Sequence, residues 1–322
     1  MRVVGSCDGV DILAPDDAYF SYFNSPYVGH KQGAAVDIYP AHRTWGETVL
    51  SPASGTIVDI RQMKMGRPRE FPTEEVDFAI GIQPSPDDDA LVRIMHCAPD
   101  VVVGDTVDAG DHIGTTLRSR FFQFWTGPHY HVEVLNRDDF NRASKSRRLS
   151  ISMGRVTSNP VKRRNTLTAE VLSVSPDRVI VHSKDLPRAS SRDLVGLAGG
   201  TADCGVTGIL DGGFSYYDHS GLVGNGDLAR GCLLFLLSHC VGELDFTFCD
   251  AHHFARTGDL DVTVDDSRVR GLSSFVYPMR SIRRGKLLVV IVPSRYDQFR
   301  GVLTEGDVCE VRINSVIAET HK

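Results

Sequence analysis

The chain has 322 residues, of which 41% are hydrophobic and 24% are charged, and its formal net charge is −6. This is an ordinary globular composition, and it excludes disordered, collagen-like and coiled-coil chains. The length favours two domains, and the mild negative charge argues against a dedicated nucleic-acid binder.

The first half of the chain carries four short runs that predict β-strands. Residues 55–60, 78–83, 91–95 and 129–135 are rich in β-branched residues or alternate between apolar and polar side chains, with turn residues at their ends. Helical periodicity is scarce throughout, and the best helical candidates, residues 193–197 and 228–237, lie in the second half.

A basic stretch marks the boundary between the two halves. Residues 142–164 contain eight Lys and Arg residues and no Asp or Glu, with Ser, Asn, Gly and Pro between them. This composition is typical of a surface connector, and the alternative is a patch for an anionic partner. No aromatic residue lies there to stack on a base, so we expect no nucleic-acid partner. We place the boundary near Asn159, which gives domains 1–158 and 159–322.

The second half is also predicted to be rich in strands, at residues 167–174, 178–182, 244–248, 260–264, 286–292 and 308–313. The whole chain is therefore predicted to be mainly β, with a second β-rich domain of unassigned fold. Its histidines, in Asp218-His219 and in the run 250–253, match no metal-site spacing, so no chemistry is assigned to them. Substrate selection, self-association or coverage of the site are open roles for this domain.

The cysteines and the apolar runs bear on location. Seven scattered cysteines without a CxxC pair fit reduced thiols better than a disulfide framework. The longest apolar run, residues 232–241, is about half as long as a membrane span. The first residues lack the basic segment and long apolar stretch of a signal peptide. We therefore expect a cytoplasmic protein without a membrane span.

Five residues of the first half form a constellation that suggests metal chemistry. In the run Gly-Pro-His-Tyr-His-Val-Glu-Val, His129 and His131 would lie on one face of a strand. His30 precedes Asp37, and His96 ends an apolar strand. Two histidines and a carboxylate make a three-ligand zinc site with a fourth position for water, and further histidines can carry protons. From spacing alone, ordinary packed or surface histidines are as good an interpretation.

Residues 28–137 resemble the lysostaphin/LytM-type zinc metallopeptidases, which cleave cell-wall cross-bridges. The matches come in the family's order: His30 and Asp37, a glycine turn entering a strand at 51–58, His96, a glycine-containing turn at 103–114, and the closing GPHYHVEV, which is similar to the family's GPHLHFE. The resemblance implies that the first domain is a duplicated-hybrid-motif β-sandwich with a lipoyl-like fold.

The resemblance also implies a site and an activity. One Zn²⁺ per chain would be bound by His30, Asp37 and His131, and His96 and His129 would act as general acid and base. The implied reaction is hydrolysis of a peptide or amide bond by a zinc-activated water, on a peptide-like or cell-wall-like substrate. A non-catalytic binding or regulatory module that keeps the metallopeptidase fold is the alternative.

The chain departs from the family in two places within this region. The family separates its first His and Asp by three residues, whereas six lie between His30 and Asp37. The extra residues could form a bulge that lets both ligands converge, or could displace His30. The loop 117–126 is also unusually aromatic, and it could form one wall of a substrate groove or pack against the second domain.

Overall fold

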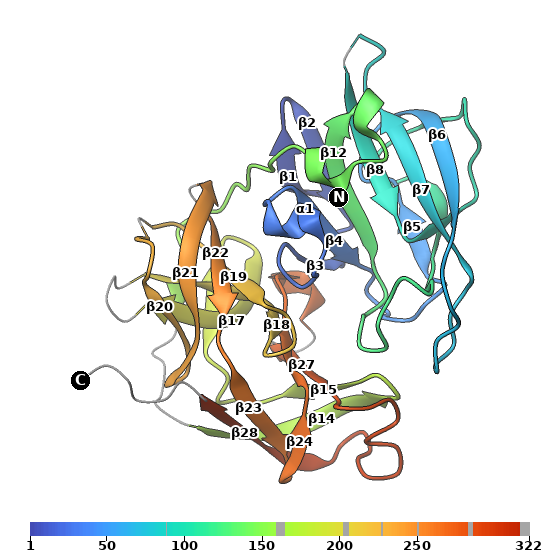
Figure 1. The fold of residues 1–322 in the computed structure, drawn as a ribbon. Coiled ribbons are helices and arrows are strands. Elements are labelled where there is room, and N and C mark those ends of the chain that lie inside the picture. Colours follow the sequence, from blue (N-terminus) through green and yellow to red (C-terminus); the bar gives the residue numbers. More distant parts are fainter. Residues whose placement is uncertain are drawn as a thin grey trace. The chain divides into compact units, whose positions relative to one another are not determined.

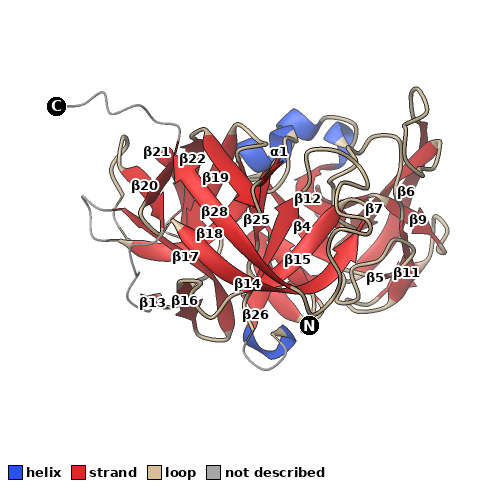
Figure 2. Cartoon of the chain, turned by 90° about the horizontal axis from the view of Figure 1, so that it is seen from below, coloured by secondary structure: helices blue, strands red, loops and turns tan. Residues whose placement is uncertain are grey.

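The structure is a computed structural model, and it describes residues 1–87, 89–158, 165–201, 206–226, 228–249, 251–282 and 286–315. The chain is mainly β, as predicted, and its few helices are short (Figures 1 and 2). Among the described residues, no helix combines the length and the apolar character that crossing a membrane requires.

The chain forms two compact units. The first contains Met1–Phe20 and Tyr27–Ser152, and the second contains Ser21–Pro26 and Met153–Lys322. The chain therefore passes between the units at three points, two of them before residue 30. The predicted boundary near Asn159 lies outside the described residues.

Strands β1 to β12 build the first unit. They are β1 (Arg2–Cys7), β2 (Val10–Ala14), β3 (Tyr19–Ser21), β4 (Ala35–Tyr39), β5 (Thr48–Leu50), β6 (Gly55–Lys64), β7 (Val76–Gln83), β8 (Ala90–Met95), β9 (Cys97–Pro99), β10 (Thr106–Val107), β11 (His112–Thr116) and β12 (Tyr130–Asn136). The helices are α1 (Val28–Lys31) and the 3₁₀ turns η1 (Arg137–Asp139) and η2 (Ala143–Lys145). The strands pair as a seven-stranded sheet in the order β10-β6-β7-β8-β12-β4-β3, a three-stranded sheet β5-β11-β9, and the hairpin β1-β2.

The centre of the seven-stranded sheet positions the candidate site. Strand β12 lies antiparallel between β4 and β8, so that His131 is opposite Asp37 on one side and Met95 on the other. Every residue of β4 and β8 is buried, as expected for strands whose two faces are both covered. His96, which follows Met95, is thereby brought close to the same point.

Strands β13 to β28 build the second unit. They are β13 (Thr157–Ser158), β14 (Thr166–Ser175), β15 (Arg178–His182), β16 (Arg188–Ser191), β17 (Leu194–Thr201), β18 (Thr207–Phe214), β19 (His219–Val223), β20 (Leu233–Leu236), β21 (His239–Cys249), β22 (His252–Thr257), β23 (Leu260–Val264), β24 (Ser267–Val269), β25 (Gly271–Ser274), β26 (Tyr277–Pro278), β27 (Leu288–Val292) and β28 (Val308–Ser315), with the 3₁₀ turn η3 (Met279–Ser281). Six of them, β17-β20-β21-β22-β19-β18, close into an antiparallel ring because β18 also pairs with β17. The predicted strands of both halves are confirmed.

The two predicted helices are wrong. Residues 193–197 enter strand β17, and residues 228–237 contain strand β20. Strand β17 carries three glycines, which disfavour a helix, and neighbouring strands pair with it on both sides. In β20, Leu234 and Leu236 are buried in the ring while Leu233 is exposed, so the leucines follow strand rather than helix periodicity.

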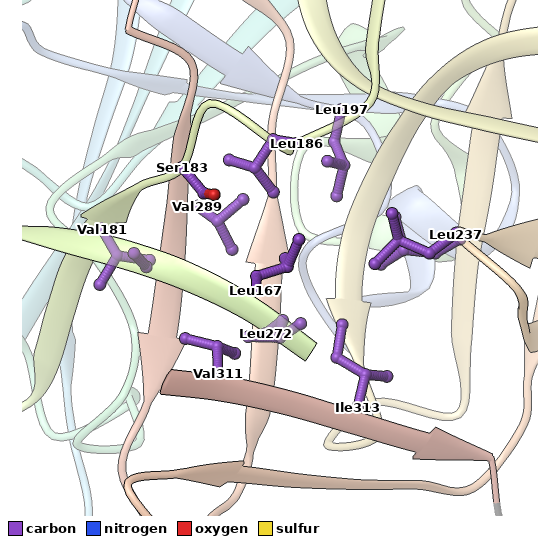
Figure 3. Close-up of a pocket in the computed structure, with 12 residues that line it drawn as sticks. Leu167, Val181, Ser183, Leu186, Leu197, Leu237, Leu272, Val289, Val311 and Ile313 are labelled. Carbon is purple, nitrogen blue, oxygen red and sulfur yellow. The ribbon is translucent and has the colours of Figure 1, made fainter. Parts of the chain in front are cut away.

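A small apolar cavity lies in the interior of the second unit. Figure 3 shows side chains such as Leu167, Val181, Leu272 and Val289 pointing into it from several strands. Its volume is about 20 Å³, which is room for roughly one water molecule. A cavity of this size with apolar walls is a packing gap in the core, and we assign no ligand to it.

The segment Ser21–Pro26 is embedded in the second unit although it comes early in the chain. The Ser21 hydroxyl donates to Oδ1 of Asp211 and the Tyr22 backbone N–H donates to Oδ2, each at 2.6 Å. The fully buried Phe23 ring lies directly against Gly221, where an added Cβ would approach a ring carbon to 2.0 Å. The segment is thus held by hydrogen bonds and by close packing.

Of the described cysteines, Cys7, Cys97, Cys240, Cys249 and Cys309 are free. Cys232, by contrast, is disulfide-bonded, which departs at that position from the reduced thiols expected from the sequence.

Candidate metal centre

Three buried side chains from three elements meet in the first unit. Nε2 of His30 on α1 lies 3.1 Å from Oδ1 of Asp37 on β4 and 3.1 Å from Nδ1 of His131 on β12. The remaining distance, from Oδ1 of Asp37 to Nδ1 of His131, is 2.8 Å. A tetrahedral zinc ion with bonds of about 2.0–2.1 Å sets neighbouring ligand atoms about 3.3 Å apart. The three atoms therefore surround one point at nearly the separations that zinc needs.

The six residues between His30 and Asp37 comprise the last residue of α1, its cap Gln32, a two-residue turn and the first two residues of β4. After α1, Gly33 adopts a left-handed backbone with φ of 67°, and the Ala34 N–H donates to the Gly29 carbonyl at 2.8 Å. A glycine in this conformation is the usual way to end a helix and redirect the chain. The chain then runs directly into β4, so the longer spacing brings the two side chains together.

A buried carboxylate orients His131. Oε1 of Glu133 lies 2.6 Å from Nε2 of His131, and Oε2 accepts a hydrogen bond of 2.5 Å from Nη2 of Arg93 and another from the Ser146 hydroxyl. Burial raises the pKa of Glu133, but the charge and hydrogen bond of His131 and the charge of Arg93 lower it to about 2. An ionised Glu133 accepts a hydrogen bond from the Nε2–H of His131 and leaves Nδ1 to face Asp37 and His30. Metal-binding histidines are commonly held by a carboxylate in this way.

Asp37 supplies the negative charge of the three-residue group. Burial raises the pKa of Asp37, but its electrostatic interactions with His129 and His30 and the hydrogen bonds from His131 and His30 hold that pKa well below its usual value. Burial lowers the pKa of His131, but Glu133 and Asp37 raise it to about 9. A metal ion that binds Nδ1 therefore has to displace a proton from this ring. Oδ2 of Asp37 is buried and has no hydrogen-bond partner among the described residues. The two imidazoles and this carboxylate are a donor set that zinc accepts.

The two other predicted histidines lie beside this group. Nδ1 of His129 is 2.8 Å from the Gly127 carbonyl, and its Nε2 is 3.6 Å from Oδ2 of Asp37. Burial and the charges of His96 and His131 lower the pKa of His129 to about 4, although Asp37 acts in the opposite direction. The His96 ring centroid is 5.5 Å from that of His129. The structure thus brings all five residues singled out in the sequence into one cluster.

Aromatic side chains cover the cluster. The rings of Phe121 and Phe122, from the loop 117–126, pack against His96 at centroid distances of 5.3 and 4.4 Å. Tyr27 lies edge-on to His131 at 4.8 Å. Phe121 is itself 45% exposed, and it forms the outer part of the cover. The aromatic loop therefore packs on the histidines themselves.

Several residues of the site were not predicted from the sequence, namely Asp77, Arg93, Ser119, Glu133 and Tyr27. Glu133 carries a usable signal, because it stands two residues after His131 and so shares its face of the strand. Asp77 carries none, because a single carboxylate near the start of a strand has no informative spacing.

Comparisons with known proteins give distant similarities. Residues 10–151, which include the whole cluster, match a family described as a domain of unknown function (DUF8155) N-terminal domain. No curated protein matches the chain. Two solved structures are similar to it: the antimicrobial peptidase lysostaphin from Staphylococcus simulans, with a TM-score of 0.27, and an NMR solution structure of lysostaphin, with a TM-score of 0.25. Both are 16% identical and cover 60% of this chain and 86% of the other.

Proposed function

We propose that the first unit is a zinc-dependent hydrolase that cleaves a peptide or amide bond. The observation that carries this proposal is the convergence of His30, Asp37 and His131 on one point, with two more histidines beside them. These three residues would hold the ion through Nε2, a carboxylate oxygen and Nδ1. When bound there, zinc lowers the pKa of a coordinated water towards about 7 and polarises a carbonyl oxygen. Three protein ligands leave a position open for that water, which is the pattern of catalytic sites.

His129 is suited to accept a proton. Its Nδ1–H donates to the Gly127 carbonyl, so Nε2 is the unprotonated nitrogen and faces the Asp37 side of the cluster. Its low pKa, about 4, keeps the ring neutral near pH 7. Such a base can take a proton from water at Nε2 and pass it to the departing amine, as amide hydrolysis requires.

His96 approaches the cluster from strand β8 and is suited to donate a hydrogen bond to substrate. Its Nδ1 is occupied by Asp77 at 2.7 Å, so Nε2 is the nitrogen left for a substrate oxygen on which negative charge develops. The exposed face of Phe121 next to His96 offers an apolar wall for a substrate side chain. The substrate we propose is peptide-like, with cell-wall-like peptides included.

Metal analysis of the full-length protein tests the proposal. We expect about one zinc per chain, lost in His131→Ala and in Asp37→Ala, because each variant removes one of three ligands. His112→Ala is the matched control, since His112 pairs with Asp100 on the surface and lies outside the cluster. Full zinc retention in both ligand variants would refute the ligand set.

Activity measurements then distinguish the histidines that bind zinc from those that act in acid–base catalysis. His129→Ala is expected to keep zinc and to lose about 10²–10⁴-fold in the rate of peptide cleavage, the usual contribution of general acid–base catalysis. A panel of peptides with glycine, apolar or aromatic residues at the cleaved bond serves as substrate.

The burial of the cluster favours one alternative, a non-catalytic module that keeps the metal. All five residues are at most 4% exposed, whereas a catalytic site must admit its substrate. A protein that binds one zinc per chain but cleaves no peptide of the panel would support this alternative over the hydrolase.

A further inference from the structure

The side chain of His96 is hydrogen-bonded to a buried carboxylate, that of Asp77, which no sequence pattern predicts. Nδ1 of His96 lies 2.7 Å from Oδ2 of Asp77, and the two residues are 4% and 1% exposed. Because both groups are shielded from water, the hydrogen bond between them is not in competition with solvent.

Asp77 is in turn held on both of its oxygens. The Ser119 hydroxyl donates to Oδ2 at 2.7 Å, and the Phe78 backbone N–H donates to Oδ1 at 2.8 Å. The carboxylate therefore has a single orientation, with Oδ1 committed to the backbone and Oδ2 shared between Ser119 and His96. This is the kind of supporting shell that keeps a functional side chain in place.

The backbone of His96 is held as firmly as its ring. Its φ of 65° is left-handed, a conformation that non-glycine residues rarely adopt. The His96 N–H donates to the Phe78 carbonyl at 3.2 Å, and the His96 carbonyl accepts from the Leu117 N–H at 2.9 Å. Strand β7, which contains Asp77 and Phe78, thus holds both the backbone and the side chain of His96. Strained backbone of this kind clusters at functional sites, where the position of a side chain outweighs the conformational energy of its backbone.

The groups around the His96 ring leave one of its nitrogens without a protein partner among the described residues. Phe122 and Phe121 pack against the His96 ring, and the His129 ring lies edge-on to it. With Nδ1 directed to Asp77, only Nε2 remains to meet a substrate. His129, by contrast, is hydrogen-bonded to the neutral carbonyl of Gly127, so the two histidines are supported by groups of different charge.

We propose that Asp77 is a positioning residue of the hydrolase: it holds His96 with the proton on Nδ1 and directs Nε2 towards the substrate oxygen. The arrangement is a carboxylate–histidine pair supported by Ser119 and the Phe78 N–H. This role rests on the proposed function, because it concerns the same site, but the protonation pattern it requires can be measured without any substrate.

The variant Asp77→Asn tests the role sharply. The Phe78 N–H requires an acceptor at the Oδ1 position, so the amide nitrogen of the introduced side chain must take the place of Oδ2. There it would donate to Nδ1 of His96 and move the ring proton to Nε2. A buried carboxylate replaced by an amide beside a catalytic histidine acts through the wrong tautomer in the same way in serine proteases.

The first measurement is ¹⁵N NMR of histidine-labelled, zinc-loaded protein. We expect the neutral His96 ring of the wild type to carry its proton on Nδ1, and that of Asp77→Asn to carry it on Nε2. Asp100→Asn is the matched control, because Asp100 contacts His112 at a similar 2.8 Å but on the surface. A wild-type His96 with its proton on Nε2 would overturn the proposal, even if Asp77→Asn fails to fold.

The second measurement is kinetic. Asp77→Asn is expected to keep one zinc per chain and to lose about 10²–10⁴-fold in kcat with little change in KM, because Asp77 contacts neither the ligands nor the substrate. A kcat within threefold of the wild type would overturn the proposal. A wild type that cleaves no peptide would count against the hydrolase itself, and the NMR result would still decide the role of Asp77.

Discussion

Individual buried charges hold the candidate metal group in place. Glu133 connects His131 to Arg93, and all three residues are at most 3% exposed. Such a network stabilises the fold only while it is complete, because a charge left alone in the interior loses its water and gains no partner. The residues that orient the ligands are therefore also residues on which the stability of the first unit depends.

We expect Glu133→Ala to lower the free energy of unfolding by about 3–5 kcal/mol, since it leaves Arg93 buried without its partner. Zinc affinity is expected to fall about 10–100-fold, because the Nε2–H of His131 loses its acceptor. Urea denaturation and a zinc titration measure the two effects. Asp59→Ala, which breaks a surface pair with Arg61, is the control and should cost at most about 1 kcal/mol.

The Asp77 carboxyl gives the fold a defined pH dependence. Burial raises the pKa of Asp77, but the charge of His96 and hydrogen bonds from His96, Ser119 and the Phe78 N–H lower it below its usual value. A lowered folded pKa adds stability above the unfolded value of about 3.9, and this is lost as the pH falls through the folded pKa. Asp77→Asn should therefore be less stable than the wild type at pH 7, by about 1–3 kcal/mol. The gap should narrow below about pH 4. Urea midpoints at pH 7, 4 and 3 check this, and a constant gap would contradict it.

The sequence pointed to the residues that share a strand or follow a known order, and it missed those that meet through the tertiary fold. His129 immediately precedes β12 and His131 is its second residue, so the common side of these two histidines follows from extended-strand geometry. Asp77 and His96 are 19 residues apart and meet only because β7 and β8 pair. No single-sequence periodicity reports that pairing.

At the scale of elements, strand β17 of the second unit shows why the local sequence predicts a helix where the fold has a strand. Strand β17 contains Gly196, Gly199 and Gly200, and its neighbours approach it too closely for larger residues. A Cβ added at Gly199 would lie 2.3 Å from the side chain of Leu210 on β18. The glycines of β17 serve the closure of the six-stranded ring, which is a long-range requirement that local propensity does not contain.

We expect Gly199→Ala to destabilise the protein by about 1–3 kcal/mol, because Leu210 must leave its position to make room. The thermal unfolding midpoint measures the effect. Gly66→Ala is the matched control, since nothing lies within 4 Å of an added Cβ there, and its midpoint should be unchanged or slightly higher. Equal midpoints for the two variants would mean that Leu210 moves aside without loss of stability, which would contradict the prediction.

At the scale of the whole molecule, the segment Ser21–Pro26 makes the two units depend on each other. Its hydrogen bonds go to Asp211, and its Phe23 ring occupies the space beside Gly221. The sequence predicted domains 1–158 and 159–322, a division in which this segment belongs entirely to the first. Contacts between residues about 190 positions apart leave no trace in composition or charge.

We expect a fragment of residues 1–158 to fold with reduced stability and to bind a hydrophobic dye, because Tyr22 and Phe23, at most 2% exposed in the full chain, would lose their partners. The same fragment with Tyr22→Ser and Phe23→Ser is the matched control and should bind less dye. A wild-type fragment as stable as the full chain, with no dye bound, would show that the segment is dispensable.

The order in which the protein is made gives this segment a further consequence. Tyr22 leaves the ribosome early, whereas its partner Asp211 is 189 residues further along the chain. At synthesis rates of about 5–20 residues per second, this delay is about 10–40 s. During that interval the aromatic side chains of Tyr22 and Phe23 lack the partners that bury them in the folded protein. A nascent chain of this protein should therefore be a client for chaperones until its second half has been translated.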